Sequence, residues 1–299
     1  MKSSRLLELE AESVFVFREI AALFKKPMLL FSGGKDSAVA LHLAKKSIYP
    51  GKTPFGLLHI DSGRDFLETR DFILQTARQN DLALTTVSVP DYLERHRDQL
   101  SEDLKSNINR LQSFALKEII HSQQYDLLVG GARRDEEKAR AKERFFSHRG
   151  VDGGWDPESQ RSEIWNLFNF HLHPGEHMRS FPLNNWTEED IWNYIAAEKI
   201  ALPPIYFSHA RKCWINTAGQ LVADSIQLNK DGWADAGTRL VRCRTVGDMT
   251  CTGLVESTAS NLFEVIAELK ESKVSERSSR IDDAFSRAAM EERKLEGYF

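Results

Sequence analysis

The chain is poor in cysteine and has no long apolar run. Its 299 residues include three cysteines, which are too few and too scattered to predict a disulfide framework or a zinc knuckle. No apolar run approaches the length of a membrane span, and the charged residues 1–12 lack the apolar core of a signal peptide. With a formal net charge of −4, the chain also lacks the basic excess of a nonspecific nucleic-acid binder. We therefore expect a cytoplasmic protein with neither a membrane nor a nucleic-acid partner.

Short apolar runs alternate with segments of helical periodicity up to about residue 200. The expected strands are 28–31, 55–60, 82–89, 126–129 and 178–181, and the expected helices include 36–46, 65–80 and 108–121. This alternation predicts an α/β fold, in which a parallel twisted sheet carries helices on both faces. Beyond this part, short runs alternate with Gly and Asn turns. We therefore expect one domain over residues 1–200 and an irregular C-terminal extension, facing a partner, over residues 201–299.

The segment SGGKDS at residues 32–37 is the most informative part of the chain, because it joins an expected strand to an expected helix. Gly33 and Gly34 have no Cβ, so their N–H groups can approach an anion closely, and the N-terminus of the following helix attracts the same anion. Lys35 adds a positive charge, and Ser32 and Ser37 add hydroxyl donors. The segment predicts a phosphate-binding site; an ordinary strand-to-helix turn is the alternative.

This segment differs from the common mononucleotide-binding P-loop. That motif requires a glycine four residues before its Gly-Lys pair and a Ser or Thr directly after the lysine. The chain has Leu29 at the first of these positions and Asp36 at the second. Asp36 could hold magnesium, directly or through water, or could cap its helix, and the sequence leaves both roles open.

Two further expected strands end in residues suited to ligand binding. His59 and Asp61 lie at the end of one strand, and Gly130 and Gly131 follow another. Since ligands of parallel sheets bind beyond the carboxyl ends of the strands, we expect three loops to converge on one nucleotide. Asp61 could hydrogen-bond a ribose hydroxyl or a base edge. A turn in which its carboxylate only accepts backbone N–H groups is equally open.

The segment GGARRDEEKARAKER at residues 130–144 is the second strong signal. Guanidinium groups bind tetrahedral oxyanions in bidentate fashion, so we expect Arg133 and Arg134 to bind an anion and Arg140 and Arg144 to have a mixed role. The alternative is a solvated helix with ion pairs four residues apart. The acids Asp135, Glu136 and Glu137 could hold magnesium or pair with these cations, and the metal ligands stay open.

The residues after this segment give weaker signals. His171, His173 and His177 surround a Pro-Gly pair that breaks any helix, so we expect a satisfied or exposed loop cluster rather than a metal site. Thr187 and Asp190 have the spacing of a helix N-terminal capping box. The tryptophans beside it, Trp186 and Trp192, are expected to anchor the core.

Several of these segments together resemble one enzyme family. SGGKDS resembles the pyrophosphate loop of the ATP-pyrophosphatase superfamily, and most of the chain is similar to the small, ATP-binding subunit of the bacterial two-subunit sulfate adenylyltransferases. The similar segments are LEAES (9–13), YPGKTPF (49–55), LLHIDSG (57–63), GGARRDEEKARAKER (130–144), WDPESQRSEIW (155–165), FPLNNWTEEDIW (181–192), RTVGDMTCTGLVES (244–257) and the final GYF. Residues 213–238 depart most from the family pattern. The resemblance implies an adenine nucleotide alpha hydrolase-like fold, related to that of phosphoadenylyl-sulfate reductases.

The resemblance also implies a reaction, in which AMP passes from ATP to sulfate to give adenosine 5′-phosphosulfate and pyrophosphate, the first step of sulfate assimilation. It implies that Lys35, Arg133 and Arg134 are catalytic. The residues implied to bind ATP are Ser32, Gly33, Gly34, Lys35, Asp36, Ser37, His59, Asp61, Gly130, Gly131, Arg140 and Arg144. Magnesium would offset phosphate charge. A large elongation-factor-like GTPase subunit would drive the reaction by hydrolysing GTP.

Other functions share part of this pattern. A phosphoadenylyl-sulfate reductase needs a nucleophilic cysteine near its C-terminus, and no cysteine follows Cys251. A transfer-RNA-modifying or amide-forming adenylyltransferase would bring a basic surface or further cysteines. A nonenzymatic subunit that senses nucleotides would bind ATP but would release no pyrophosphate when sulfate is added.

Overall fold

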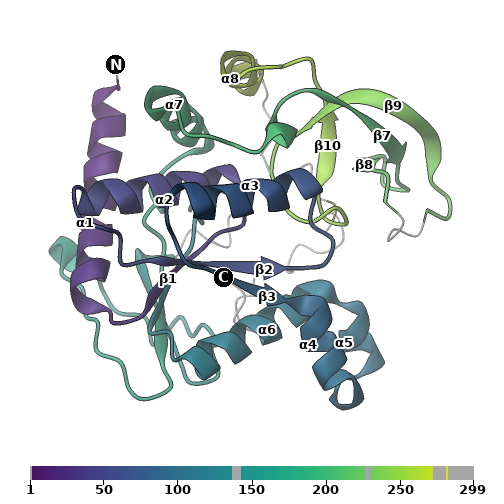
Figure 1. Ribbon diagram of the computed structural model, residues 1–299. Helices are drawn as coiled ribbons and strands as arrows, with labels where there is room; N and C mark the ends of the chain where they lie inside the picture. Colours follow the sequence, from purple (N-terminus) through teal and green to yellow (C-terminus); the bar gives the residue numbers. More distant parts are fainter. Residues whose placement is uncertain (1, 137–142, 226–229, 272–280, 282–299) are drawn as a thin grey trace.

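A six-stranded sheet forms the centre of the molecule (Figure 1). The structure is a computed structural model that describes residues 2–136, 143–225, 230–271 and 281. The strands are β1 (Pro27–Leu30), β2 (Gly56–Asp61), β3 (Leu84–Ser88), β4 (Leu127–Val129), β5 (Phe146–Arg149) and β6 (His177–Ser180), in the order β3-β2-β1-β4-β6-β5. All neighbours pair in parallel except β5, which runs antiparallel to β6 at the edge. The expected parallel α/β sheet is thus confirmed, and β5 is an addition that its polar sequence did not predict.

Helices cover both faces of this sheet, as expected (Figure 1). One face carries α1 (Ser4–Leu23), α2 (Lys35–Ile48), α3 (Leu67–Gln79) and α7 (Glu188–Glu198), and the other carries α4 (Val89–His96), α5 (Glu102–Ser106) and α6 (Ile108–Gln123). A sheet buried on both faces needs continuous apolar strands. In β4, Leu127 and Val129 belong to the apolar core on the α1 side, whereas Leu128 packs with Leu116 and Ile120 of α6.

Helix α7 begins where the capping-box spacing predicts. Thr187 accepts the backbone N–H of Asp190, and the Asp190 carboxylate accepts the backbone N–H of Thr187, so both exposed donors of the first turn are satisfied. Trp186 and Trp192 are both fully buried in the large apolar core, as expected.

The part after residue 201 is more regular than the sequence indicates. Four antiparallel strands close into a small barrel in the order β10-β8-β7-β9. They are β7 (His209–Ile215), β8 (Leu221–Ala223), β9 (Ala234–Cys243) and β10 (Gly253–Glu256), and helix α8 (Leu262–Glu271) follows them. Cys213 and Cys243 lie in the apolar interior of this barrel, and none of the three cysteines forms a disulfide.

The barrel is joined to the sheet through the loop after β2. Phe66 of this loop packs in the barrel interior, and the carbonyl oxygen of Arg64 accepts the N–H of Met249 at 2.9 Å. In turn, Tyr206 and Val265 belong to the same apolar core as α1 and α2. The division of the chain into residues 1–200 and 201–299 stays a prediction. Among the residues that the structure describes, no helix has both the length and the apolar character needed to cross a membrane.

Candidate nucleotide site

The loop between β1 and α2 depends on glycine in two ways. Gly33 adopts a φ of 74°, which side-chain-bearing residues rarely adopt. A Cβ atom there would lie 2.9 Å from Cγ2 of Thr69 and 3.0 Å from Cγ1 of Ile73, so α3 leaves no room for a side chain. Gly34 is the N-cap residue of α2 and has no side chain to cap the helix. The loop therefore turns tightly onto the positive end of α2, as a phosphate site requires.

Two of the expected catalytic cations meet at the carboxylate of Asp36. Lys35 Nζ lies 2.9 Å from Oδ2 of Asp36, and Arg133 Nε donates to Oδ1 of the same carboxylate at 2.7 Å. Lys35 and Arg133 are almost fully buried. Burial disfavours the ionised form of Asp36, but the charges of Arg133 and Lys35 outweigh it and hold the pKa of this carboxyl below its ordinary value. The carboxylate therefore stays charged. It links the first turn of α2, which follows β1, to Arg133 in the loop after β4.

Tyr206 closes the loop from the C-terminal part of the chain. Its Oη accepts the backbone N–H of Lys35 at 2.9 Å, in the first turn of α2. Tyr206 is 1% exposed, and burial raises the pKa of its phenol above the ordinary value, so the hydroxyl stays neutral. A Cβ atom at Gly34 would lie 3.4 Å from the Tyr206 Oη and 4.0 Å from the carbonyl oxygen of Val246. No sequence pattern predicted this role of Tyr206. Val246 lies in residues 244–257, which were noted only for their resemblance to the family.

The two serines of the loop have different environments. Ser32 is exposed, and its Oγ accepts the backbone N–H of Gly34 at 3.3 Å. Ser37 is buried, and its hydroxyl donates to the carbonyl oxygen of Gly34 at 2.9 Å. Ser32 is thus the serine whose hydroxyl is accessible to a ligand, while Ser37 stabilises the first turn of α2.

Carboxylates of Asp61 and Asp65 stabilise the turn that follows β2. Asp61 accepts the N–H of Gly63 at 2.8 Å, which is the turn that the sequence left open as an alternative. His59 is buried, with Nδ1 at 3.1 Å from the carbonyl oxygen of Phe31 and Nε2 at 3.1 Å from a carboxylate oxygen of Asp65. His59 therefore links the end of β1 to the loop after β2. Contacts of His59 or Asp61 with a nucleotide stay predictions.

The two glycines after β4 bring its loop close to its neighbours. Gly130 donates its N–H to the carbonyl oxygen of Ser180 at the end of β6, at 2.8 Å. A Cβ atom at Gly131 would lie 3.0 Å from the carbonyl carbon of Asp36 and 3.1 Å from the nitrogen of Ser37. The glycine thus allows this loop to pack on the start of α2 and to place Arg133 against Asp36.

Arg134 and Arg144 of this segment have surroundings that differ from those of Arg133. Arg134 is exposed, and its N–H donates to the carbonyl oxygen of Asn184. Arg144 is exposed as well. Burial raises the pKa of Glu163 above its ordinary value, and the charges of Arg144 and Arg134 offset only part of this rise. Arg140 and Glu137 lie outside the described residues. Anion binding by Arg134, Arg140 and Arg144 stays a prediction.

The three histidines do not form one cluster. His171 and His173 are exposed in the loop before β6, with ring centroids 4.8 Å apart, as expected. His177 differs from the expectation, because it lies in strand β6 and is 2% exposed. Among the residues that the structure describes, no group of three or more His, Cys, Asp or Glu side chains could hold a metal ion.

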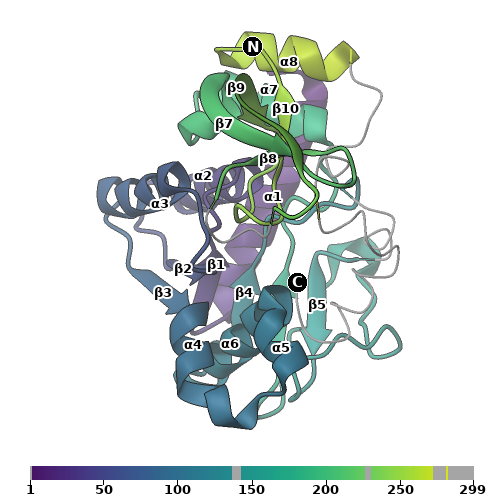
Figure 2. The same ribbon diagram turned by 90° about the vertical axis from the view of Figure 1, so that its right-hand side faces the viewer.

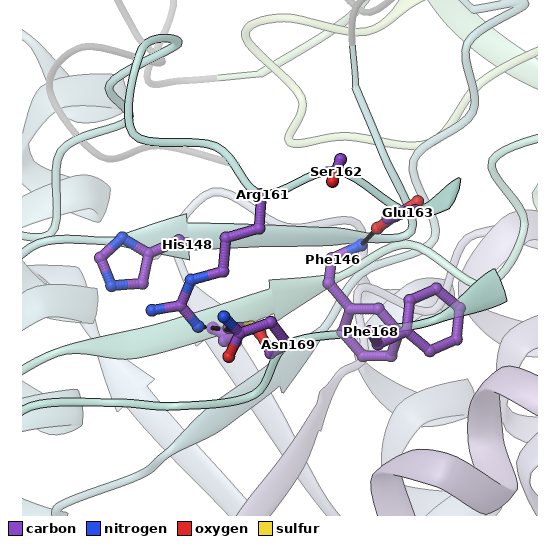
Figure 3. Close-up of a pocket in the computed structure, with 8 residues that line it drawn as sticks. Phe146, His148, Arg161, Ser162, Glu163, Phe168 and Asn169 are labelled. Atoms are coloured by element: carbon purple, nitrogen blue, oxygen red, sulfur yellow. Dashed lines mark hydrogen bonds between the residues drawn. The ribbon is translucent and has the colours of Figure 1, made fainter. Parts of the chain in front are cut away.

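A small pocket beside β5 is separate from these loops (Figure 3). It lies on the α1 side of the sheet, where Phe146 and Met178 join the large apolar core. The residues that line it are Phe146, His148, Arg161, Ser162, Glu163, Phe168, Asn169 and Met178. Its volume of about 10 Å³ holds about one water molecule, so a nucleotide cannot occupy it.

Comparison with known proteins identifies the family. A family model described as the phosphoadenosine phosphosulfate reductase domain matches residues 26–254, which include all the loops described above. Sulfate adenylyltransferase subunit 2 of Mycolicibacterium vanbaalenii is 49% identical over 297 residues, which are 99% of this chain and 95% of that protein. The chain belongs to the sulfate adenylyltransferase subunit 2 family. The member of this family from Streptomyces lavendulae is 48% identical over 297 residues, with 99% and 92% of the two chains covered.

Solved structures similar to this family member are more distant. FMN adenylyltransferase of Candida glabrata, in complex with FMN and an ATP analogue, is 16% identical, with a TM-score of 0.46 and coverage of 69% of this chain and 63% of that one. Phosphoadenylyl-sulfate reductase of Candida auris is 14% identical, with a TM-score of 0.46 and coverage of 77% and 98%. Assignment to the subunit 2 family therefore depends on the curated relatives. The description of the fold depends on the order and direction of the strands in this structure.

Proposed function

We propose that this chain is the ATP-binding subunit of a two-subunit sulfate adenylyltransferase, and that it transfers AMP from ATP to sulfate. The products are adenosine 5′-phosphosulfate and pyrophosphate. The observation that supports this most strongly is the meeting of Lys35 and Arg133 at Asp36, beside a glycine loop at the carboxyl edge of a parallel sheet. Relatives named sulfate adenylyltransferase subunit 2 over nearly the whole chain identify the class of reaction.

The reaction needs positioning and charge stabilisation more than proton transfer. An oxygen of sulfate attacks the α-phosphorus of ATP, the bond from this phosphorus to the bridging oxygen breaks, and the electron pair leaves with pyrophosphate. No proton moves and no covalent enzyme intermediate forms. Charge builds up on the α-phosphate and on the leaving pyrophosphate, and fixed cations and N–H groups stabilise such charge best where water is excluded.

We assign the roles of the chain accordingly. The backbone N–H groups of Gly33 and Gly34, with Lys35 and the accessible hydroxyl of Ser32, hold the β- and γ-phosphates. Arg133 contacts the α-phosphate, and Asp36 holds both cations in place. The ribose or base lies toward the turn at Asp61. Because Lys35 and Arg133 are buried and fixed, they need little reorganisation as the charge develops.

A magnesium ion fits this site only with ATP as its main source of ligands. Asp36 is engaged by Lys35 and Arg133, so its oxygens are already satisfied. Magnesium usually takes few protein ligands and several phosphate oxygens and waters, which agrees with such an environment. Bound with ATP, it would offset phosphate charge.

A partner subunit completes the proposal. The name of the relatives, subunit 2, implies a second subunit, and we propose that this is an elongation-factor-like GTPase. Hydrolysis of the phosphate–sulfate anhydride in the product releases more free energy than hydrolysis of the ATP bond that breaks, so the reaction alone is unfavourable. GTP hydrolysis by the partner would make the overall reaction favourable. The low cysteine content agrees with a reducing, cytoplasmic location.

The test is sulfate-dependent release of pyrophosphate from ATP by the chain together with its partner subunit, with and without GTP. We expect release that requires sulfate and increases with GTP. Binding of ATP without sulfate-dependent release would contradict the proposal and would indicate a nucleotide-sensing subunit instead.

A further inference from the structure

A largely buried ion pair joins the barrel to the first turn of α7. Arg244 directly follows β9, and its Nε and Nη2 donate to the two carboxylate oxygens of Glu188, at 3.3 and 2.9 Å. The two side chains are 10% and 14% exposed. A guanidinium group that holds both oxygens of one carboxylate fixes the orientation of both groups. Figures 1 and 2 show α7 and the barrel on the same side of the sheet. The start of the loop after β9 is thus held against the start of α7.

The backbone of Glu188 holds a second acid, Asp135, which lies in the loop after β4. The N–H of Glu188 donates to Oδ2 of Asp135 at 3.2 Å. The first N–H groups of a helix have no partner within the helix, and the positive end of the helix dipole attracts a carboxylate. The first turn of α7 therefore fixes the position of the Asp135 carboxylate.

Asp135 in turn contacts the arginine that is proposed to bind the α-phosphate. Its Oδ2 lies 3.7 Å from Nη1 of Arg133, and Nε of the same guanidinium group donates to Asp36 at 2.7 Å. Asp36 belongs to the first turn of α2, whereas Asp135 is anchored to α7. Each carboxylate restricts the orientation of the planar guanidinium group. The direction of Arg133 therefore depends on α7 as well as on α2.

Contacts other than this ion pair hold the loop after β9 in place. The N–H of Met249 donates to the carbonyl oxygen of Arg64 at 2.9 Å, and the Met249 side chain packs against the barrel interior. The carboxylate of Asp248 accepts two backbone N–H groups within the loop. Loss of the charge of Arg244 should therefore affect the carboxylate of Glu188 and the first turn of α7 more than it affects the loop.

We propose that Arg244 is a positioning residue for Arg133, which it reaches through the first turn of α7, and this inference rests on the proposed function. Without Arg244, the negative charge of Glu188 is unbalanced close to the carboxylate of Asp135. Repulsion then displaces Asp135 and, with it, Arg133. Charge builds up at the α-phosphate in the transition state, so a small displacement of Arg133 slows the reaction. The glycine loop keeps its contacts with ATP.

The test uses the chain with its partner subunit, ATP, GTP and sulfate, and measures kcat and the KM for ATP from pyrophosphate release. We expect Arg244→Gln to lower kcat roughly tenfold and to change the KM for ATP by less than about twofold. Arg244→Lys keeps the charge but loses the fork geometry, so its kcat should lie between those of the wild type and Arg244→Gln. In the Arg133→Ala variant, Arg244→Gln should lower kcat by less than about twofold, because the group that it positions is absent.

Arg242 provides a matched control, because it lies in the same strand and joins the barrel to a different helix. It is 3% exposed, and its Nε and Nη2 lie 2.9 and 2.8 Å from a carboxylate oxygen of Glu268 in α8. Arg242→Gln therefore removes a comparable ion pair that has no connection to Asp135. Both glutamine variants should lower the free energy of unfolding, but Arg242→Gln should keep the wild-type kcat.

The outcomes distinguish this inference from the proposed function. If the wild-type complex releases no pyrophosphate with sulfate, the proposed function fails. If the wild type is active, three results would overturn the positioning role alone: a wild-type kcat in Arg244→Gln, an equal loss of kcat in Arg242→Gln, or an undiminished effect of Arg244→Gln in the Arg133→Ala variant. Should Arg244→Gln not fold, Asp135→Asn replaces it, because the Asp135 side chain is 50% exposed. A wild-type kcat in Asp135→Asn would likewise overturn the role.

Discussion

The hydroxyl of Tyr206 accepts the backbone N–H of Lys35 at 2.9 Å, although 171 positions separate these residues in the sequence. This bond joins the segment before the barrel to the first turn of α2, where the phosphates of a nucleotide are expected. The ring of Tyr206 also packs edge-on against Trp192 of α7, with ring centroids 5.5 Å apart. The site is therefore built from residues far apart in the chain, and each contact offers a test.

Removal of the Tyr206 hydroxyl should weaken both the fold and the site. Tyr206→Phe leaves the N–H of Lys35 without its acceptor, so we expect the free energy of unfolding to fall by about 1 kcal/mol and the KM for ATP to rise. Denaturant unfolding and pyrophosphate release measure these effects. Tyr49→Phe is the matched control, because Tyr49 is 82% exposed. Equal behaviour of the two variants would show that the bond to Lys35 is unimportant.

Lys35 and Arg133 should act as a unit, because both contact the same carboxylate. We expect Lys35→Ala and Arg133→Ala each to lower kcat/KM by roughly a hundredfold or more, as loss of a fixed charge does in other active sites. The double variant should lose less than the product of the two effects, since each single change already disturbs Asp36. Steady-state kinetics of all three variants give the comparison.

Arg78→Ala is a suitable control for these variants, because Arg78 is exposed in the last turn of α3. It should retain wild-type kcat/KM. Full activity in both Lys35→Ala and Arg133→Ala would remove the proposed site.

Activity should require a glycine at position 131, because a larger residue does not fit against α2. The Cβ of Gly131→Ala would lie 3.0 Å from backbone of Asp36, so the loop after β4 must move away from α2 and take Arg133 with it. We expect activity to fall roughly tenfold to a hundredfold, since small displacements of catalytic groups have such effects. Gly237→Ala is the control, because a Cβ at Gly237 in β9 meets nothing within 4 Å. A wild-type rate in Gly131→Ala would mean that the contact with Asp36 does not position Arg133.

The free energy of unfolding should depend on pH through Glu198, which ends α7 and pairs with Lys2 and Lys46. Burial raises its pKa, but the ammonium groups of Lys2 and Lys46 outweigh this and lower the pKa from 4.5 to about 2. A carboxyl whose pKa is lower in the folded state stabilises the fold above its unfolded pKa. The contribution is therefore complete above about pH 4.5 and is lost as the pH falls toward 2.

Unfolding of Glu198→Gln over this pH range tests the sign. The variant should be less stable than the wild type near pH 7, and the difference should shrink as the pH falls below 4.5. Glu94→Gln, at an exposed position of α4, should change stability little at any pH. A difference that grows as the pH falls would contradict the assignment.

The sequence predicted most of the sheet because its signals are local. Apolar runs such as Leu127–Val129 are continuous where both sheet faces are covered, and glycines mark the turns that follow. β5 was missed, since Ser147, His148 and Arg149 do not have the composition of a buried strand. The barrel was missed because its strands are short and alternate with turns, and because part of its interior comes from Phe66 after β2.

The parallel α/β sheet, the glycine loop at residues 32–37 and the resemblance to an adenylyl-transferring family could be inferred from the sequence alone. The three-dimensional arrangement was needed to show that Lys35 and Arg133 meet at Asp36, that Tyr206 closes the loop, and that Asp135 and Arg244 both contact Glu188. The reason is physical. Periodicity and turn residues report the environment of each segment, whereas the order and register of strands decide which distant side chains become neighbours.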